Sequence, residues 1–560
     1  MSPLRQRRCV RRALSSSQRT NLLSTPQGGD VEQKVDICVV GAGFAGMYTI
    51  VKARAMGKSV RVFEAGTDVG GTWYWNRYPG ARCDIESVEY SYSFDEDLQQ
   101  EWNWTERYAA QPEILKYAQH VADRFDLRSD IQFSTRVLSA HFDEATSTWL
   151  TRTDHGDVVR SQFIVFATGC LSSANRPHFD GSDLFSGETY HTGEWPHDGV
   201  DFSGKTVGLI GTGSSAIQSI PLIAEQSKHL TVFQRTASFS IPARNDSIDQ
   251  EYVQRVKSDY KSFRDANRIQ TGAFGSTIER GDSSALDATE DVRREEFERR
   301  WAKGGFGFLS SYNDFLLKQE ANETIAEFVR EKIRNIVHDS QTAEALMPQQ
   351  VIGCKRLCLD TNYYETFNRS NVSLVPVDKH PIEKITANGL VVNGKEHTFD
   401  VLVYATGFDA MTGSLLKIDI RGRNNKSLGD AWHAGPVTYL GLNTAGFPNM
   451  FMVSGPGSPS VLTNMIMSIE QHVEWITDCI AYMATKGQST IETTEESQTT
   501  WVAFVNAVAD MTLYPSCNSW YLGANVPGKP RVFMPLIGFP TYVEKCNEVV
   551  RNDYQGFVLT

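Results

Sequence analysis

Short runs dominated by apolar residues, many of them β-branched, recur along the chain and favour buried strands. Two pairs of such runs are each separated by a segment that fits a helix, and the four runs are residues 35–40, 60–63, 206–210 and 230–233. A glycine-rich turn follows the first run of each pair, which gives the order strand, turn, helix, strand. The pattern therefore predicts two βαβ units, each the core of a domain with a parallel sheet.

The stretch after the second unit differs, because its apolar residues recur at helical spacing among many charged side chains. A helix with one buried face is predicted by Ile325, Phe328, Val329, Ile333 and Ile336. Two further apolar runs, 163–166 and 401–404, each precede the tripeptide Ala-Thr-Gly and predict strands that return the chain from one unit to the other. We therefore predict a helical insertion within the second unit.

The predicted fold class is α/β, with two Rossmann-like dinucleotide-binding domains and an all-helical insertion in the second. The last stretch of the chain is expected to carry active-site loops as well as part of the first domain. The expected boundaries are 31–175 and 409–560 for the first domain, 176–241 and 351–408 for the second, 242–350 for the insertion, and 1–30 for a tail.

The net charge of the chain and the lengths of its apolar runs limit the kinds of partner that we expect. The chain of 560 residues has a net charge of −12, so neither nucleic acid nor an anionic membrane is expected as its main partner. No apolar run reaches the roughly 18 residues of a transmembrane helix. Residues 1–29 hold six arginines and no acidic residue. A disordered tail on a cytoplasmic protein is the favoured interpretation, and a mitochondrial targeting segment is the alternative.

The nine cysteines lie far apart and include no Cys-x-x-Cys pair. This spacing fits a reducing compartment and predicts neither a disulfide framework nor a zinc site, so no metal is expected. It also argues against the dithiol flavin reductases, which need a paired disulfide beside the flavin.

The first glycine-rich turn opens the helix after the first strand and comprises Gly41, Ala42, Gly43, Phe44, Ala45 and Gly46. In such a turn Gly41 makes the tight bend, Gly43 lets the backbone approach a pyrophosphate, and Gly46 lets helix and strand pack closely. The helix N-terminus adds N–H donors and the positive end of the helix dipole. Glu64 stands at the tip of the next strand, where a carboxylate accepts hydrogen bonds from ribose hydroxyls.

The second turn has the same place in the second unit and comprises Gly211, Thr212, Gly213, Ser214, Ser215 and Ala216. Gln234 stands where the first unit has Glu64, and Arg235 and Thr236 follow it. An acid at this position would repel a 2′-phosphate, whereas an arginine and a hydroxyl would bind one. The second site is therefore expected to prefer NADPH to NADH, with a surface arginine in a loop as the alternative. Two dinucleotides on one chain imply electron transfer between them.

Four other charged or aromatic residues have no clear functional role from residue type and spacing alone. Asp84 and Arg356 lie far apart in sequence, and a structural ion pair or solvated charges is the simpler interpretation of both. An isolated histidine such as His191 is usually structural, and Trp195, which precedes a proline, would usually be a packed corner. A buried arginine would nevertheless be useful wherever an oxyanion or a peroxide develops.

Two longer motifs make the chain resemble a known family. Residues 185–196 fit the pattern Phe-x-Gly-x-x-x-His-x-x-x-Trp-Pro, and residues 70–84 read Gly-Gly-Thr-Trp-Tyr-Trp-Asn-Arg-Tyr-Pro-Gly-Ala-Arg-Cys-Asp. The first pattern is the fingerprint of type I Baeyer–Villiger monooxygenases, and within that family the chain most resembles the phenylacetone monooxygenases. The likeness runs from about Val35 to Thr560 and leaves out the tail.

The resemblance implies FAD in the first domain, NADPH in the second, and a ketone and O2 as substrates. NADPH would reduce the flavin, the reduced flavin would form a C4a-peroxyflavin with O2, and the peroxide would attack the ketone to give an ester or lactone. An N- or S-oxidising flavin monooxygenase is the alternative, although Trp195 and Pro196 argue against it. A redox-sensing binding protein is a rival outside catalysis. We expect a monomer.

The resemblance also implies roles for particular residues. Asp84 would orient Arg356 beside the flavin, and Arg356 would stabilise the peroxide and the oxyanion that follows it. Lys355 would join Arg235 and Thr236 on the 2′-phosphate of NADPH. Further cofactor contacts are expected from Gly71, Thr72, Trp73, Tyr90, Val137, Met465 and Trp520.

The remaining implied residues surround the cofactors. His191 and Trp195 lie in residues 185–196, the linker that leads into the second domain, and would serve a conformational change rather than direct chemistry. The linker and the loop 455–462 are expected to close the site against water. The substrate pocket would be lined by Cys170, Ser460, Val461 and Leu462. Cys170 and Val461 replace a glutamine and an alanine of the phenylacetone monooxygenases, so the resemblance does not fix the preferred ketone.

Overall fold

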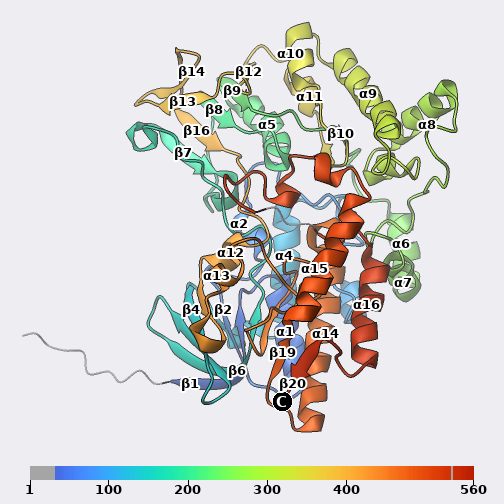
Figure 1. The fold of residues 1–560 in the computed structure, drawn as a ribbon. Coiled ribbons are helices and arrows are strands. Elements are labelled where there is room, and N and C mark those ends of the chain that lie inside the picture. The colour runs from blue at the N-terminus through green and yellow to red at the C-terminus, as the bar shows by residue number, and fades with distance from the viewer. Residues whose placement is uncertain (1–31, 531–533) are drawn as a thin grey trace, which may run out of the picture.

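The computed structural model describes residues 32–530 and 534–560, and Figure 1 shows two α/β lobes with a group of helices beside them. The predicted disordered or targeting tail, residues 1–30, lies outside the described residues. None of the described helices combines the length and the apolar character that a membrane span requires.

The first lobe contains a sheet in the order β17-β4-β5-β6-β1-β2-β3, with β18 paired to β6. β1 runs parallel to both β2 and β6, as a Rossmann-like unit requires. One face of the sheet packs on α1, α4 and α14, whose apolar side chains form the largest core cluster. The strands are β1 (Gln33–Val40), β2 (Val60–Phe63), β3 (Ile131–Gln132), β4 (Val137–Asp143), β5 (Thr148–Thr153), β6 (Val158–Phe166), β17 (Asp419–Arg421) and β18 (Met450–Met452).

Helices from both ends of the chain complete this lobe, with the C-terminal ones drawn in red in Figure 1. They are α1 (Phe44–Ala55), α2 (Thr72–Trp75), α3 (Glu96–Glu101), α4 (Gln111–Arg124), α12 (Gly413–Leu416), α13 (Leu428–Ala431), α14 (Met465–Lys486), α15 (Glu495–Asp510) and α16 (Phe539–Arg551). A two-stranded sheet of β19 (Ile491–Thr493) and β20 (Phe557–Leu559) fixes the C-terminal end of the chain.

The second lobe has a parallel five-stranded sheet in the order β12-β9-β8-β16-β7. Its strands are β7 (Glu188–His191), β8 (Thr206–Ile210), β9 (His229–Gln234), β12 (Val372–Pro376) and β16 (Val401–Tyr404), and its helices are α5 (Ser214–Gln226) and α11 (Tyr363–Thr366). A small antiparallel sheet adds β13 (Ile382–Ile385), β14 (Gly389–Val392) and β15 (Lys395–Thr398).

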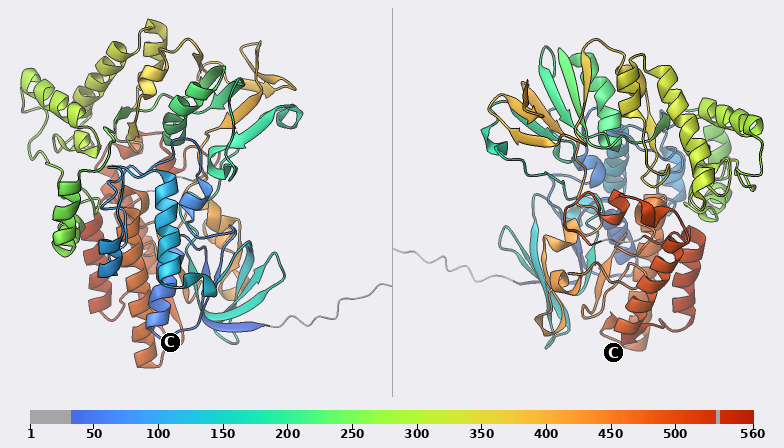
Figure 2. Two further views of the ribbon diagram at one scale, coloured as in Figure 1. Left: turned by 180° about the vertical axis from the view of Figure 1, so that it is seen from behind. Right: turned by 45° about the horizontal axis from the view of Figure 1, so that its top comes forward.

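The helical insertion leaves the second lobe after β10 (Ser240–Pro242) and returns at β11 (Cys358–Asp360), and these two strands pair in parallel at its base. Its helices are α6 (Gln250–Ser258), α7 (Tyr260–Arg268), α8 (Glu290–Lys303), α9 (Gln319–Ile336) and α10 (Ser340–Leu346). The insertion packs on both lobes, because apolar residues of α6 and α7 join the core of the first lobe and those of α8 and α9 join that of the second. Figure 2 shows this division from two further sides.

The predicted return strands lie in β6 and β16. Each is followed directly by an Ala-Thr-Gly tripeptide, and the chain then crosses to the other lobe. The two crossing segments meet, because the Asn175 N–H donates to the Gly407 carbonyl at 2.9 Å. The lobes are therefore connected where both glycine-rich turns also lie.

Candidate functional site

The first glycine-rich turn has no room for side chains at its two tightest points. Gly41 adopts a φ of +103°, and a Cβ atom there would lie 2.6 Å from the Ala167 carbonyl oxygen. A Cβ on Gly46 would lie 1.9 Å from the Gly41 carbonyl oxygen. Both residues must therefore be glycine for α1 to begin directly at the end of β1. At Gly43, the N-cap of α1, a Cβ atom would lie 3.3 Å from the Gly71 Cα, so the two glycines let their backbones approach closely at this end of the helix.

Glu64 is buried at the tip of β2 and connects that strand to the turn. Its carboxylate accepts hydrogen bonds from the N–H groups of Ala42 (2.8 Å) and Gly66 (2.7 Å). Burial raises its pKa, although these N–H groups act in the opposite direction. A carboxylate offers about four lone-pair positions, so acceptor capacity remains for the hydroxyls of a ribose.

The second turn repeats the geometry of the first. Gly211 has a φ of +118°, and a Cβ atom there would lie 2.4 Å from the Ala405 carbonyl oxygen, which corresponds to Ala167 in the first lobe. A Cβ on Gly213 would meet no atom within 4 Å, so the N-terminus of α5 is open. The first turn of neither α1 nor α5 contains an acidic residue that would oppose an anion.

Two cations lie beside the second turn. Arg235 and Thr236 are exposed at the end of β9, and Lys355 is half-buried close enough to Arg235 for the two charges to interact. Burial, and after it the charge of Arg235, lowers the pKa of Lys355. No described carboxylate forms an ion pair with either cation. Two like charges without a protein counter-ion suit an anionic ligand, and the open helix end beside them suits a dinucleotide phosphate.

Asp84 and Arg356, 272 residues apart, form a two-pronged ion pair between the lobes. The Arg356 Nε and Nη2 atoms each donate to one carboxylate oxygen of Asp84, the latter at 2.8 Å, and Nη1 donates to the Val461 carbonyl at 2.6 Å. The guanidinium also lies over the Phe306 ring, 5.0 Å from its centre. Burial alone would lower the pKa of Arg356, but the charge of Asp84 outweighs it and raises the pKa.

An apolar cluster surrounds this ion pair. Four residues are predicted to line the substrate pocket. Two of them, Cys170 and Val461, are buried members of this cluster, and a third, Leu462, packs against it. The fourth, Ser460, is buried next to them and points its hydroxyl at the Met411 sulfur. Trp520 packs at the edge of the same cluster, with its ring centre 4.4 Å from that of Tyr521.

Two hollows adjoin the pair. One lies between the first lobe and the insertion, and its walls include Asp84, Glu86, Glu89, Phe274, Ile278 and Phe306. The other, which is smaller, faces the second lobe, and its walls include Phe239, Gln350, Gly353, Lys355 and Arg356. Asp84 therefore lines the first hollow and Arg356 lines the second.

Of the predicted flavin contacts, Trp73 and Tyr90 lie side by side, and Met465 packs against the core cluster that holds them. Trp73, in α2 after Gly71 and Thr72, donates its indole N–H to the Tyr90 hydroxyl at 3.1 Å. Met465 begins α14 and also packs on the cluster around Arg356. Val137 is buried at the start of β4, in a different core cluster that includes Val40 and Phe63.

His191 and Trp195 lie in the linker, and both are buried. The His191 Nδ1 atom accepts from the Gly193 N–H at 3.0 Å, and Nε2 lies 3.3 Å from both the Asn175 carbonyl and the Thr406 hydroxyl. Burial, and secondarily the charge of Arg176, lowers the pKa of His191. Its ring therefore touches both crossing segments between the lobes. Trp195 packs in the core of the second lobe, as a packed corner would.

The prediction of no disulfide was wrong for one pair of cysteines. Cys354 and Cys517, whose Cα atoms are 6.2 Å apart, form a disulfide, and the other six cysteines of the described chain are free and buried. Sequence spacing could not reveal this pair, because 163 residues separate its members. The link joins the segment of Lys355 and Arg356 to the segment of Trp520.

Sequence reasoning also missed Tyr521 and Tyr514. Tyr521 lies beside the Arg356 guanidinium, and burial raises its pKa to about 12 although that positive charge acts to lower it. Tyr514 stacks on the Tyr521 ring at 6.3 Å and donates to the Gly353 carbonyl at 3.1 Å. Only the position of Tyr521, directly after Trp520, could have drawn attention to it.

Comparison with known proteins identifies the family of this chain. A model described as pyridine nucleotide-disulphide oxidoreductase matches residues 38–297. A Baeyer-Villiger monooxygenase from Pseudooceanicola batsensis is 42% identical over 528 residues, which are 93% of this chain and 96% of the relative. The chain belongs to the Baeyer–Villiger monooxygenase family. Phenazine N-monooxygenase from Lysobacter antibioticus is also 42% identical, over 94% of this chain and 97% of its own length.

Solved structures of Baeyer–Villiger enzymes and their relatives share the fold. A steroid monooxygenase bound to NADP is 50% identical, with a TM-score of 0.89 over 94% of this chain and 99% of that one. The OTEMO complex with FAD and NADP is 40% identical, with a TM-score of 0.91 over 94% of this chain and 100% of that one. The α/β fold with two Rossmann-like domains for FAD and NADP, predicted from the sequence, is thereby confirmed.

Proposed function

We propose that Arg356, held by Asp84, carries the reaction of this Baeyer–Villiger monooxygenase. The enzyme uses FAD and NADPH to convert ketones into esters or lactones. The two-pronged pairing of Arg356 with Asp84 supports this assignment most strongly, because it fixes a permanently charged donor between the two dinucleotide lobes.

FAD, when bound and reduced by NADPH, supplies the activation of O2. The protein must then stabilise the negative charge that collects on oxygen as the ketone carbonyl is attacked. A guanidinium has five N–H groups, and Arg356 uses three of them on Asp84 and Val461. The Tyr521 hydroxyl also lies beside the guanidinium. The N–H groups that are not bound to Asp84 or Val461 can serve reacting oxygen atoms, and because Asp84 fixes the group beforehand, little reorganisation is needed.

Lys355, Arg235 and Thr236 are proposed to hold the 2′-phosphate of NADPH. The proximity of the two cations and the absence of a described carboxylate partner support this role. The pyrophosphates of FAD and NADPH are assigned to the N-termini of α1 and α5, and Glu64 to the ribose of FAD.

His191 and Trp195 are proposed to serve the movement of the two lobes. His191 contacts both crossing segments, so a shift of one lobe against the other must change its hydrogen bonds. Trp73, Tyr90, Val137, Met465 and Trp520 keep their proposed roles as cofactor contacts.

The substrate is proposed to be an apolar ketone that lies against Cys170, Val461 and Leu462. The cluster around these residues offers apolar side chains and one nearby hydroxyl, that of Ser460. The replacements at Cys170 and Val461 argue against carrying the phenylacetone preference over to this chain. The monomeric state and the cytoplasmic location stay predictions. Cyclohexanone, phenylacetone and a steroid ketone, each assayed for substrate-dependent NADPH oxidation with product identification, test the proposal, and the absence of any ester or lactone would contradict it.

N-oxidation is a second candidate function, favoured by the 42% identity to a phenazine N-monooxygenase. That reaction transfers oxygen to a soft nucleophile and needs no stabilised carbonyl oxyanion. Phenazine and a thioether belong in the same assay. Oxygen transfer to these compounds with none to a ketone would favour the second candidate.

A further inference from the structure

We propose that α9 of the insertion is a brace for the active site, with Asn322 and Arg330 as positioning residues. Both hold the segment 348–356, whose last two residues are Lys355 and Arg356. The proposal rests on the roles proposed above for those two residues. It assigns to the helical insertion a part in cofactor binding that is separate from its own folding.

Asn322 holds the backbone of this segment at Ile352. Its side chain is fully buried, and its amide donates to the carbonyls of Ile352 (2.9 Å) and Phe315 (2.7 Å). Its amide oxygen accepts from the Ile352 N–H at 3.0 Å. Both polar groups of one residue are thus bound by one side chain, as in a pair of strands, which fixes the position and the direction of the chain there.

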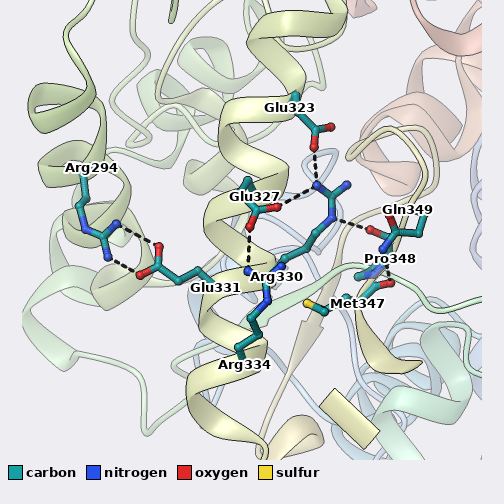
Figure 3. A network of polar contacts seen from close by, with 9 residues as sticks. All are labelled: Arg294, Glu323, Glu327, Arg330, Glu331, Arg334, Met347, Pro348 and Gln349. Atoms are coloured by element: carbon teal, nitrogen blue, oxygen red, sulfur yellow. Dashed lines mark hydrogen bonds and ion pairs between the residues drawn. The ribbon is translucent and has the colours of Figure 1, made fainter. Parts of the chain in front are cut away.

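Arg330 holds the same segment at Pro348, four residues before Ile352. Its Nε atom donates to the Pro348 carbonyl at 2.9 Å, and its Nη1 atom donates to Glu323 (2.5 Å) and Glu327 (3.2 Å) of the same helix. Figure 3 shows the guanidinium directed from α9 to Pro348, with both carboxylates beside it. The arginine is 6% exposed and also lies over the Phe239 ring.

The spacing of the two grips fits a segment that runs along the helix. Asn322 and Arg330 are eight residues apart, which is about 12 Å of α-helix. Ile352 and Pro348 are four residues apart, which is about 13 Å of extended chain. The two lengths are similar, so residues 348–352 lie along α9 and run in the direction opposite to the helix. The chain then turns at residues 352–353, and Arg356 follows four residues after Ile352.

The chemistry of the brace points to positioning. An apolar core at this place would be at least as stabilising as buried amide and guanidinium groups, but it would allow the segment to shift. The braced segment also forms a wall of the hollow next to Lys355, through Gln350 and Gly353. A displacement of about 1 Å in such a wall typically lowers catalytic efficiency about a hundredfold.

Asn322→Leu tests the brace, with Asn443→Leu as its matched control. Asn443 is also fully buried, and its side chain donates to the Met450 carbonyl and accepts from the Thr493 N–H, far along the chain from Lys355. We expect both variants to lose similar thermal stability. Only Asn322→Leu should speed amide hydrogen exchange across residues 350–357, lower kcat/KM for NADPH at least tenfold, and lower the ester formed per NADPH consumed.

Arg330→Met keeps the proposal testable if Asn322→Leu fails to fold. Its control is Arg334→Met, because Arg334 also pairs with Glu327 but does not contact the segment. The same losses are expected in Arg330→Met and not in Arg334→Met. Parent-like exchange and parent-like NADPH kinetics in Arg330→Met or Asn322→Leu would overturn the brace. Faster exchange without any loss of NADPH kinetics would overturn instead the roles proposed for Lys355 and Arg356.

Discussion

Replacing Arg356 with alanine should separate the consumption of NADPH from the formation of product. The change removes both bonds to Asp84, the bond to the Val461 carbonyl, and the N–H groups proposed to serve reacting oxygen. Water reaches the Asp84 side chain, which is 28% exposed, so the carboxylate left behind can be solvated and the fold should survive.

The size of the effect follows from the loss of a preorganised donor. Such a loss raises the barrier by about 3 kcal/mol, which corresponds to a factor of about 150 in rate. Ester formation should therefore fall at least a hundredfold, while FAD binding and NADPH oxidation continue and the oxygen is released as hydrogen peroxide. Arg356→Lys, which keeps the charge but cannot fork, should lie between the alanine variant and the parent.

The assay follows three quantities in one reaction: NADPH absorbance, hydrogen peroxide by a peroxidase-coupled dye, and ester by gas chromatography. Circular dichroism and the flavin spectrum show whether the variant is folded and loaded. An alanine variant that makes ester at close to the parent rate would remove Arg356 from the mechanism.

Three further predictions concern the cofactor, pH and the disulfide. Arg235→Ala should raise the KM for NADPH at least tenfold and leave that for NADH nearly unchanged; equal losses would refute the phosphate assignment. Burial raises the pKa of Glu89 to about 8, from an ordinary 4.5, where its carboxylate accepts from the Gly275 N–H. The protonated Glu89 carboxyl therefore contributes its full stability below about pH 4.5, and this contribution is lost as the pH rises through 8. Glu89→Gln should reduce the fall of Tm between pH 5 and 9, and an unchanged slope of Tm against pH would contradict this. Cys517→Ser, or treatment of the parent enzyme with dithiothreitol, should lower Tm, because a disulfide that closes so long a loop contributes up to about 5 kcal/mol of stability. If dithiothreitol leaves the Tm of the parent unchanged, the Cys354–Cys517 bond adds nothing to stability.

The strands and glycine turns could be predicted because their signals are local. The run at 206–210 and β8 coincide, and the two glycine turns occupy the predicted places between strand and helix. Hydrophobic periodicity depends on which face of an element is buried, and that is decided within a few residues. The helical insertion was predictable for the same reason.

The meeting of distant residues could not be read from local pattern. Asp84 and Arg356 were paired through family resemblance, since no rule of spacing connects residues 272 positions apart. The Val461 carbonyl, Tyr521 and the Cys354–Cys517 link were missed, because each depends on how the C-terminal segments fold back over the lobes. The division of the insertion between both lobes was hidden for the same reason: amphipathicity indicates a buried face, but not its partner.

Oxidation of a ketone under 18O2 tests the central claim most directly. The FAD-loaded enzyme, NADPH and cyclohexanone, or whichever ketone of the panel reacts best, would be incubated under labelled oxygen and the product analysed by mass spectrometry. We predict an ester or lactone with one 18O atom, at the inserted position, and one NADPH consumed for each product formed. A product without label, or NADPH consumption that yields hydrogen peroxide with every ketone tried, would contradict the account.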